Sequence, residues 1–266
     1  MKFSYYPGCT LRTQAKDLDK WGRLALEKLG VTLEEINDWQ CCGAVYPQSS
    51  DEIAKKLSAV RALIAAKKNG GKLVTLCSAC FNVIKRVNAD MKENGDVSRR
   101  ANNYLVSTGY IEAGDEYKGE TEVLHYLEVL RDYVGWDKVK AAVVNPLTDR
   151  KIGAYYGCLL LRPNSVMQFD NPENPQIIED FIRAIGATPV NYALRNECCG
   201  NYVALKTPDA VKSQVDKIER NAALSGATAL VTACPSCKYN LKVNGNGEVD
   251  VVYITELLAE ALGIKE

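Results

Sequence analysis

One pattern of cysteines occurs twice in this chain of 266 residues and accounts for all ten of its cysteines. Each copy has a single cysteine, an adjacent pair and a C-x-x-C motif: Cys9, Cys41-Cys42 and Cys77-x-x-Cys80, then Cys158, Cys198-Cys199 and Cys234-x-x-Cys237. Between the pair and the C-x-x-C motif lie 34 residues in both copies. Between the single cysteine and the pair lie 31 residues in the first copy and 39 in the second. This agreement indicates a duplicated unit.

The residues around the cysteines repeat as well. The segment Tyr5-Tyr6-Pro7-Gly8-Cys9 is echoed by Tyr155-Tyr156-Gly157-Cys158, and a glycine follows each cysteine pair, at Gly43 and Gly200. A glycine next to a ligand site commonly allows the backbone to approach closely. The duplication therefore extends beyond the cysteines to their immediate surroundings.

Strand and helix signals alternate along both copies, which is typical of an α/β fold. We expect strands at 2–6, 31–39, 73–76, 152–156, 187–194 and 229–233. Helices are expected at 17–29, 51–68, 176–185 and 208–224, with further helices opened by the two C-x-x-C motifs. The short, continuously apolar strands are of the kind buried in parallel sheets. The prediction is two pseudo-symmetric halves, each a small, mainly parallel sheet flanked by helices.

The repeat also predicts where the halves divide. The first half is expected at 1–150 and the second at 151–266. Cys80 lies 48 positions before Glu128, whereas Cys237 lies only 19 before the matching Glu256, so the first half carries an insertion at about 88–120. Its composition suggests a helix and a loop that could form a lid or a docking surface. A Pro- and Asn-rich loop at 163–175 lengthens the second half.

Composition narrows the classes of function and location. The formal net charge is zero with charges well mixed, so no basic patch points to nucleic acid as a partner. No apolar run approaches the roughly 20 residues that span a bilayer, and the N-terminus lacks the apolar core of a signal peptide. We therefore expect a cytoplasmic protein. In a reducing compartment ten cysteines are better explained by metal binding than by disulfides.

The cysteines follow three successive strands in each half, and the loops after parallel strands meet at one edge of a sheet, where ligands usually bind. Five thiolates are therefore expected to gather at the carboxyl ends of the strands in each half. A zinc site takes four ligands, and adjacent cysteines rarely point into one small coordination shell. An iron–sulfur cluster is favoured, because it offers several iron atoms to soft thiolate ligands. Zinc in one half, or a redox dithiol at a C-x-x-C motif, remains the alternative.

The doubled C…C-C-G…C-x-x-C pattern resembles the CCG-domain (cysteine-rich domain) family, and a two-copy chain of this size is similar to the family's heterodisulfide reductase B subunits. The resemblance covers the chain from Tyr5 to Leu258. It implies two 4Fe-4S clusters of non-cubane type, each held by five cysteines, one of which bridges irons. Carried over by motif, the ligands are Cys9, Cys41, Cys42, Cys77 and Cys80 for one cluster, and Cys158, Cys198, Cys199, Cys234 and Cys237 for the other.

The resemblance also implies an activity and partners. The activity is reduction of a disulfide of the coenzyme M–coenzyme B type to two thiols. The implied partners are a ferredoxin-like C subunit, with a flavin-containing A subunit behind it, since this chain has neither a G-x-G-x-x-G fingerprint nor a ferredoxin motif. The alternatives are a related CCG protein that reduces another disulfide, such as that of a sulfur-carrier protein, or one that serves a hydroxy-acid or thiol:fumarate oxidoreductase. From a different class, the chain could be a non-catalytic assembly module stabilised by zinc.

The only histidine, His125, lies in an apolar stretch opposite Tyr253 of the second copy. A packed and hydrogen-bonded core histidine is the favoured interpretation. The break in the repeat also makes His125 the candidate catalytic residue, as a proton donor to a departing thiolate, because the unperturbed pKa of histidine is near neutrality.

Overall fold

The computed structural model describes residues 1–37, 39–44 and 51–265, which form two four-stranded sheets with only parallel neighbours. The strand order is β2-β1-β3-β4 in the first sheet and β6-β5-β7-β8 in the second, so the two sheets have the same topology. The strands are β1 (Lys2–Tyr5), β2 (Thr32–Glu35), β3 (Lys72–Thr75), β4 (Glu122–His125), β5 (Lys151–Tyr155), β6 (Thr188–Val190), β7 (Ala229–Thr232) and β8 (Asp250–Tyr253). The predicted α/β fold of two pseudo-symmetric halves is confirmed.

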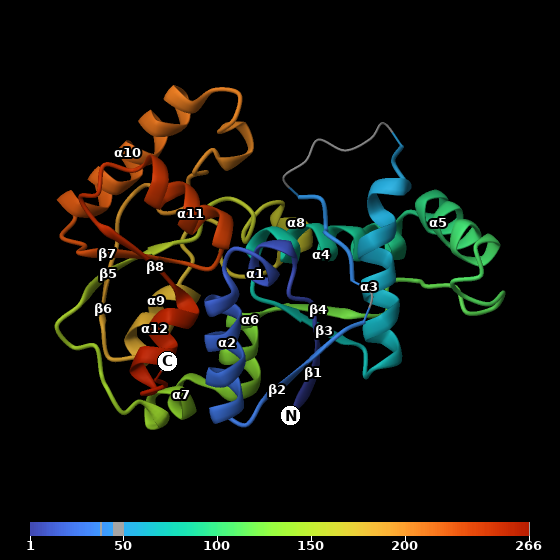
Figure 1. Cartoon of the computed structure of the whole chain (residues 1–266), viewed down its shortest axis with the longest axis horizontal. Helices are drawn as coiled ribbons and strands as arrows, with labels where there is room; N and C mark the ends of the chain where they lie inside the picture. The colour runs from blue at the N-terminus through green and yellow to red at the C-terminus, as the bar shows by residue number, and fades with distance from the viewer. Residues whose placement is uncertain (38, 45–50, 266) are drawn as a thin grey trace.

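Helices flank both sheets (Figure 1). In the first half these are α1 (Cys9–Arg12), α2 (Lys16–Lys28), the short 3-10 turn η1 (Ala54–Lys56), α3 (Leu57–Lys68), α4 (Ser78–Glu93), α5 (Gly95–Ser107), α6 (Tyr126–Glu128), the π-helical η2 (Val129–Val134) and α7 (Trp136–Ala142). In the second half they are α8 (Asn164–Met167), α9 (Ile177–Ala184), the 3-10 turn η3 (Asn201–Val203), α10 (Pro208–Leu224), α11 (Pro235–Asn244) and α12 (Ile254–Ala261). Among the described residues, no helix has both the length and the apolar character needed to cross a bilayer.

Helix α2 illustrates why the predicted elements form. Leu18, Ala25 and Leu26 recur on one face and are buried, while Gly30 ends the helix with a φ of +81°, a left-handed conformation that glycine adopts without strain. Gly22 stands where α2 approaches the end of β3, because a Cβ at this position would lie 2.6 Å from Cδ2 of Leu76. The periodic apolar face and the two glycines together fix where this helix begins, ends and packs.

Several predicted boundaries differ from the structure. β2 ends at Glu35 and β6 at Val190, four residues before the predicted ends in both cases. The helix predicted from 51 starts with one 3-10 turn and becomes α-helical at Leu57, while Oδ1 of Asp51 accepts hydrogen bonds from the backbone N–H groups of Ile53 and Ala54. Ser50, predicted with Asp51 as its cap, lies outside the described residues. The sequence prediction missed β4 and β8, although it matched the two segments as repeats.

One of the two core clusters runs across both halves, while the other belongs to the second half. Helices α2 and α12 lie side by side between the sheets (Figure 1), and the hydroxyl of Thr255 in α12 donates to the carbonyl of Leu18 in α2 at 2.9 Å. Across the same boundary, Tyr253 donates to the carbonyl of Leu76 at 2.6 Å. Because residues of both halves interlock, the cysteine-bearing ends of the two sheets are held in fixed relation to each other.

The insertion of the first half forms a helix and a loop, as predicted. After α4, Asn94 caps α5 with hydrogen bonds from Asp96 and Val97. Helix α5 projects from the side of the first half that faces away from the second half (Figure 1). The insertion therefore does not cover the boundary between the halves. The 163–175 loop of the second half contains α8, which packs against α4.

Candidate metal centres

The order of the strands explains where the cysteines gather. In an order 2-1-3-4 the chain leaves the first strand toward one side of the sheet and returns on its other side, which creates a ligand-binding crevice at the carboxyl ends of the first and third strands. Cys9 follows β1 and Cys77 follows β3, where it caps the N-terminus of α4. Cys158 and Cys234 occupy the same places after β5 and β7. The predicted meeting of the cysteines at the strand ends agrees with this arrangement.

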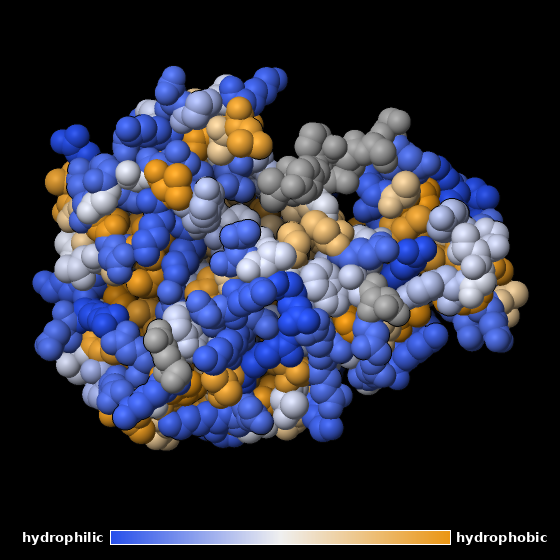
Figure 2. Space-filling view, in the orientation of Figure 1, coloured by the Kyte–Doolittle hydropathy of each residue, from blue (hydrophilic) through white to orange (hydrophobic). Residues whose placement is uncertain are grey.

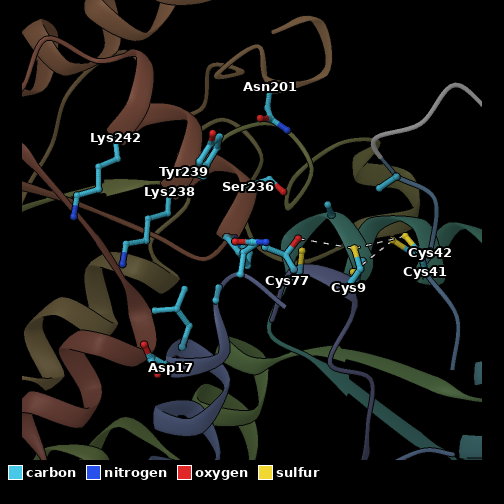
Figure 3. A pocket seen from close by; sticks show the side chains of 18 of the residues that line it. Cys9, Asp17, Cys41, Cys42, Cys77, Asn201, Ser236, Lys238, Tyr239 and Lys242 are labelled. Atoms are coloured by element: carbon cyan, nitrogen blue, oxygen red, sulfur yellow. Dashed lines mark hydrogen bonds between the residues drawn. The ribbon is translucent and has the colours of Figure 1, made fainter. Parts of the chain in front are cut away.

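In the first half, all five cysteines line one cavity of about 720 Å³ (Figure 3). The Sγ atoms of Cys9 and Cys41 are 3.6 Å apart, and those of Cys42 and Cys80 are 3.5 Å apart. The cavity opens between the halves, where Figure 2 shows the surface hollowed between the lobe that carries α10 and the first half. The structure thus brings together the whole first set of predicted ligands.

In the second half, all five cysteines line a much smaller pocket of about 30 Å³. The Sγ atoms of Cys199 and Cys237 are 3.5 Å apart, as in the equivalent pair of the first half. The two cavities adjoin, because Ala79, Asn201 and Ser236 line both of them. The two cysteine sets therefore lie on either side of one common wall.

The cysteines interact across this wall as well as within each half. A hydrogen bond between the thiols of Cys77 and Cys234 raises the pKa of Cys77 and contributes to lowering the pKa of Cys234. These two residues are the first cysteines of the two C-x-x-C motifs. At the two C-x-x-C motifs, a cysteine of one half thus interacts directly with a cysteine of the other half.

In each cysteine pair the surroundings lower the pKa of one thiol and raise that of its neighbour, Cys41 or Cys199. Hydrogen bonds from Cys41 and Cys80 lower the pKa of the Cys42 thiol to about 4, and hydrogen bonds from Cys158 and Cys199 lower that of Cys198 to about 2. The backbone N–H of Gly43 donates to Sγ of Cys41 at 3.4 Å, and that of Gly200 to Sγ of Cys198 at 3.3 Å. The thiolate is the form of cysteine that binds metals. Each half therefore has at least one cysteine prepared for coordination at neutral pH.

These donors fit an iron–sulfur group. They are soft sulfur atoms, they number five in each half, and backbone N–H groups approach them as they do around cluster sulfurs. The described ranges 1–37, 39–44 and 51–265 contain no group of three or more His, Cys, Asp or Glu side chains arranged to hold a single metal ion. The residues that would hold the group in each half are the five that line its cavity.

The large cavity also has an apolar wall and a charged wall. The sequence did not predict that these residues line the same cavity. Leu18 and Trp21 of α2 line one side, and Lys238 and Lys242 of α11 line another. Figure 3 shows these two lysines on α11, apart from the sulfurs of Cys9, Cys41 and Cys42. Lys238 forms an ion pair with Glu256. The sequence did contain a signal for this pair of lysines, because residues four apart on the helix that follows the second C-x-x-C motif lie on one face.

His125 lies outside this arrangement. It is fully buried, its Nδ1 accepts a hydrogen bond from the N–H of Leu127, and its Nε2 lies 3.1 Å from the carbonyl oxygen of Leu76. Its ring packs edge-on against Phe81 and Phe169. Burial lowers its pKa to about 4, so the ring is neutral at pH 7. His125 lines neither cysteine cavity as the structure describes them, which favours the packed core histidine over the proton donor.

Comparison with known proteins agrees with this site. The family model described as "Cysteine-rich domain" (CCG) matches residues 3–85 and 152–242, which together are well over half of the chain. The chain belongs to the CCG cysteine-rich domain family. Each matched segment contains one full set of five cysteines. The family model thus matches once in each half, and each half also contains one of the two sheets.

Relatives of nearly the same length carry the names of redox subunits. The membrane anchor of the 8-methylmenaquinol:fumarate reductase of Wolinella succinogenes is 29% identical over 99% of this chain and 93% of its own length. The B subunit of the ferredoxin/F(420)H(2)-dependent CoB-CoM heterodisulfide reductase of Methanosarcina acetivorans is 28% identical over 98% of this chain and 89% of its own. A protein of Archaeoglobus profundus, named as like the heterodisulfide reductase B subunit, is 26% identical over 99% of this chain and 91% of its own. This CCG protein is therefore related to redox subunits of oxidoreductase complexes.

A solved structure supports the fold. A hypothetical protein from Helicobacter pylori superposes on the whole of this chain with a TM-score of 0.73 at 13% sequence identity. The chain spans about half the length of that protein, because the match covers 49% of it. At this identity the likeness concerns the fold alone.

Proposed function

We propose that this CCG protein is the catalytic B subunit of a heterodisulfide reductase complex, which reduces a disulfide of the coenzyme M–coenzyme B type to two thiols. The observation that carries the proposal is the common wall of Ala79, Asn201 and Ser236 between the two five-cysteine cavities. Breaking a sulfur–sulfur bond takes two electrons, and two redox sites on either side of one shared wall could both supply electrons to a bond held beside that wall. In this proposal both copies of the repeat are needed, because each copy holds one of the two redox sites.

Each half would hold one 4Fe-4S cluster of non-cubane type through its five cysteines. When bound, the clusters would supply the two electrons one at a time. The protein itself favours the thiolate of one cysteine in each pair, directs the Gly43 and Gly200 N–H groups at sulfur and buries the second set in part. These features support metal binding.

The walls of the large cavity support a small coenzyme disulfide as the substrate. Its volume of about 720 Å³ lies within the range of about 300–1,000 Å³ typical of small-molecule sites. Trp21 and Leu18 offer apolar contact to an alkyl chain, while the ammonium group of Lys242 offers a partner to a sulfonate, carboxylate or phosphate. A sulfur-carrier protein would instead require an open groove.

The complex supplies the remaining parts in this proposal. A ferredoxin-like C subunit would pass electrons to this chain from a flavin-containing A subunit, in line with the names of relatives as parts of such complexes. The proposed location is the cytoplasm. In a reducing compartment cysteines serve metal binding more often than disulfides, which supports this location for a protein with two cysteine sets.

A second candidate function is electron transfer within a fumarate reductase complex. The Wolinella succinogenes relative, at 29% identity over nearly the full length of both chains, favours it. In that role the two metal centres would take electrons from a donor and pass them on, without a disulfide substrate. The large cavity would then bind the electron donor or a neighbouring protein of the complex.

One assay with the purified complex separates these functions. Reduced viologen is offered as electron donor, and consumption is followed with the coenzyme M–coenzyme B disulfide, a protein-bound disulfide and fumarate in turn. The proposal expects turnover with the small disulfide alone. Turnover with fumarate and none with any disulfide would establish the second candidate, and stoichiometric zinc in both halves would establish the assembly module.

A further inference from the structure

One tyrosine occupies the same place in each half, beside the cysteine site. Tyr6 lies three residues before Cys9, and Tyr155 lies three residues before Cys158, each at the carboxyl end of the first strand of its half. Both side chains are buried, with exposed fractions of 1% and 0%. The strand register pairs Ser4 with Leu73 and Gly153 with Leu230, so Tyr6 and Tyr155 occupy equivalent places without a gap in the alignment.

The hydroxyl groups of these tyrosines bind equivalent atoms. Tyr6 donates to the carbonyl oxygen of Gln40, and Tyr155 donates to that of Glu197 at 2.8 Å. Gln40 and Glu197 are the residues directly before the cysteine pairs. In both halves the phenol thus restrains the backbone from which the pair projects.

The rings of the same tyrosines contact the other two cysteine segments. A Cβ placed on Gly8 would lie 3.5 Å from Cε1 of Tyr6 and 2.8 Å from Sγ of Cys80. A Cβ placed on Gly157 would lie 3.5 Å from Cε1 of Tyr155 and 3.7 Å from Sγ of Cys237. Each ring therefore packs beside the glycine that precedes the single cysteine and close to the last cysteine of the C-x-x-C motif.

The neighbouring tyrosines show that this placement is specific. Tyr5 is equally buried and lies next to Tyr6, but its hydroxyl donates to Asp19 at 2.6 Å. The hydroxyl of Tyr156 donates to Glu179. Of these four tyrosines, Tyr6 and Tyr155 are thus the two whose hydroxyls donate to the carbonyl before a cysteine pair.

We propose that Tyr6 and Tyr155 are positioning residues that hold the three cysteine segments of each half in register for the bound cluster. This inference rests on the proposed iron–sulfur function. The hydroxyl of each tyrosine restrains the cysteine pair, and its ring packs beside the glycine of the single-cysteine turn, close to the last cysteine of the C-x-x-C motif. Groups that orient metal ligands in this way commonly affect metal affinity by about 10–100-fold.

The test uses Tyr6→Phe and Tyr155→Phe in the intact complex, with Tyr5→Phe as the matched control. Each of the two phenylalanine variants keeps the ring and removes one hydrogen bond to the carbonyl before the pair. We expect iron release to a chelator to be about 10-fold faster or more, measured as a rate on the purified complex. Tyr6→Phe should change the electron paramagnetic resonance signal and reduction potential of one cluster, and Tyr155→Phe those of the other. Tyr5→Phe should leave all of these unchanged.

The outcomes distinguish this inference from the proposed function. If the wild-type complex contains iron and acid-labile sulfide, but both cysteine-facing variants release iron at the rate of Tyr5→Phe with unchanged spectra, only the positioning role is overturned. If the wild-type complex contains no iron, both are overturned. Thermal unfolding of the three variants shows that the fold is kept, and the two halves give independent tests if one variant unfolds.

Discussion

In the first half the cysteines line an open cavity of about 720 Å³, whereas in the second half they enclose a pocket of about 30 Å³. Cys9 and Cys41 are exposed, but their counterparts Cys158 and Cys198 are partly buried. Leu159 and Tyr202 lie against the second set, and the first set faces the α11 wall of the large cavity. The same strand order and cysteine pattern thus occur in two different environments, and under the proposed function a substrate would enter through the large cavity.

The two halves also differ at His125, whose counterpart in the second half is Tyr253. His125 and Tyr253 both precede a short helix, and each takes part in a capping box with a glutamate, Glu128 or Glu256. Both side chains also reach the carbonyl of Leu76, at 3.1 Å and 2.6 Å. The two residues therefore share one structural task at the boundary of the halves, and the histidine needs no catalytic role to explain it.

The largest effect is expected from removing one ligand in either half. Cys42→Ala and Cys199→Ala should each abolish disulfide reduction, because both metal centres are needed for the two electrons. Iron per chain should fall by about half in each variant, since one five-thiolate set remains complete. Viologen oxidation and iron analysis measure these changes. Wild-type rates in either variant would show that the two halves do not act together.

A second difference between the halves concerns two glutamates in equivalent caps. Burial raises the pKa of Glu128 to about 7, so the folded protein binds this proton more tightly than the unfolded chain, whose glutamate has its ordinary pKa of 4.5. The stability that this proton adds is complete below about pH 4.5 and is lost as pH rises through 7, by up to about 3 kcal/mol at 1.36 kcal/mol per pKa unit. Glu128→Gln should remove this part of the pH dependence.

Denaturant unfolding between pH 5 and pH 8 checks the prediction, with Glu256→Gln as the matched variant. The carboxylate of Glu256 is paired with Lys238. We expect Glu128→Gln to flatten the loss of unfolding free energy toward pH 8, while Glu256→Gln keeps the wild-type slope. Burial raises the pKa of Glu128 although Lys85 lies 3.8 Å from its carboxylate, and equal slopes in wild type and Glu128→Gln would contradict this dominance of burial.

The glycines before the single cysteines should also respond unequally. Gly8 has φ +76° and ψ 166°, a region that is essentially restricted to glycine, and an added Cβ would meet Sγ of Cys80 at 2.8 Å. At Gly157 the nearest sulfur would be 3.7 Å away, which is ordinary contact. Gly8→Ala should cost about 1–3 kcal/mol of unfolding free energy, and Gly157→Ala less. Equal losses by thermal unfolding would mean that the close approach in the first half has no energetic weight.

The smallest effect is expected at the α11 wall of the large cavity. Lys242→Gln should raise KM for an anionic disulfide about fivefold, because an exposed ion pair contributes up to about 1 kcal/mol. KM for an uncharged disulfide should not change, and Lys217→Gln on α10 serves as the control. A loss that is the same for charged and uncharged disulfides would argue against an electrostatic role of Lys242.

The sequence predicted the architecture because its signals are local or repeated. The bounds of α10 match the prediction at both ends, since Pro208 starts the helix and Gly226 follows it. The strands β4 and β8 were missed although β3 and β7 are equally short, because no cysteine motif follows β4 or β8 to mark the end of a strand. The pairing of Tyr6 with Tyr155 was also missed, because matching Tyr5-Tyr6 with Tyr155-Tyr156 shifts the alignment by one residue.

The site was predictable only in part. The spacing of the cysteines indicated two five-membered sets at the strand ends, and the structure brings each set to one cavity. The difference in cavity size could not be predicted, because it depends on how α11, η3 and the chain after Cys158 pack across the boundary of the halves. The contribution of Asn201 and Ser236 to both cavities has the same origin, since each comes from the second half and reaches the first.

Anomalous X-ray scattering at the iron edge, from crystals of the intact complex, tests the central claim most directly. The account predicts one iron centre within the set of Cys9, Cys41, Cys42, Cys77 and Cys80, and a second within the set of Cys158, Cys198, Cys199, Cys234 and Cys237, on opposite sides of Ala79 and Ser236. Iron in one set alone, or a signal at the zinc edge in place of iron, would contradict it.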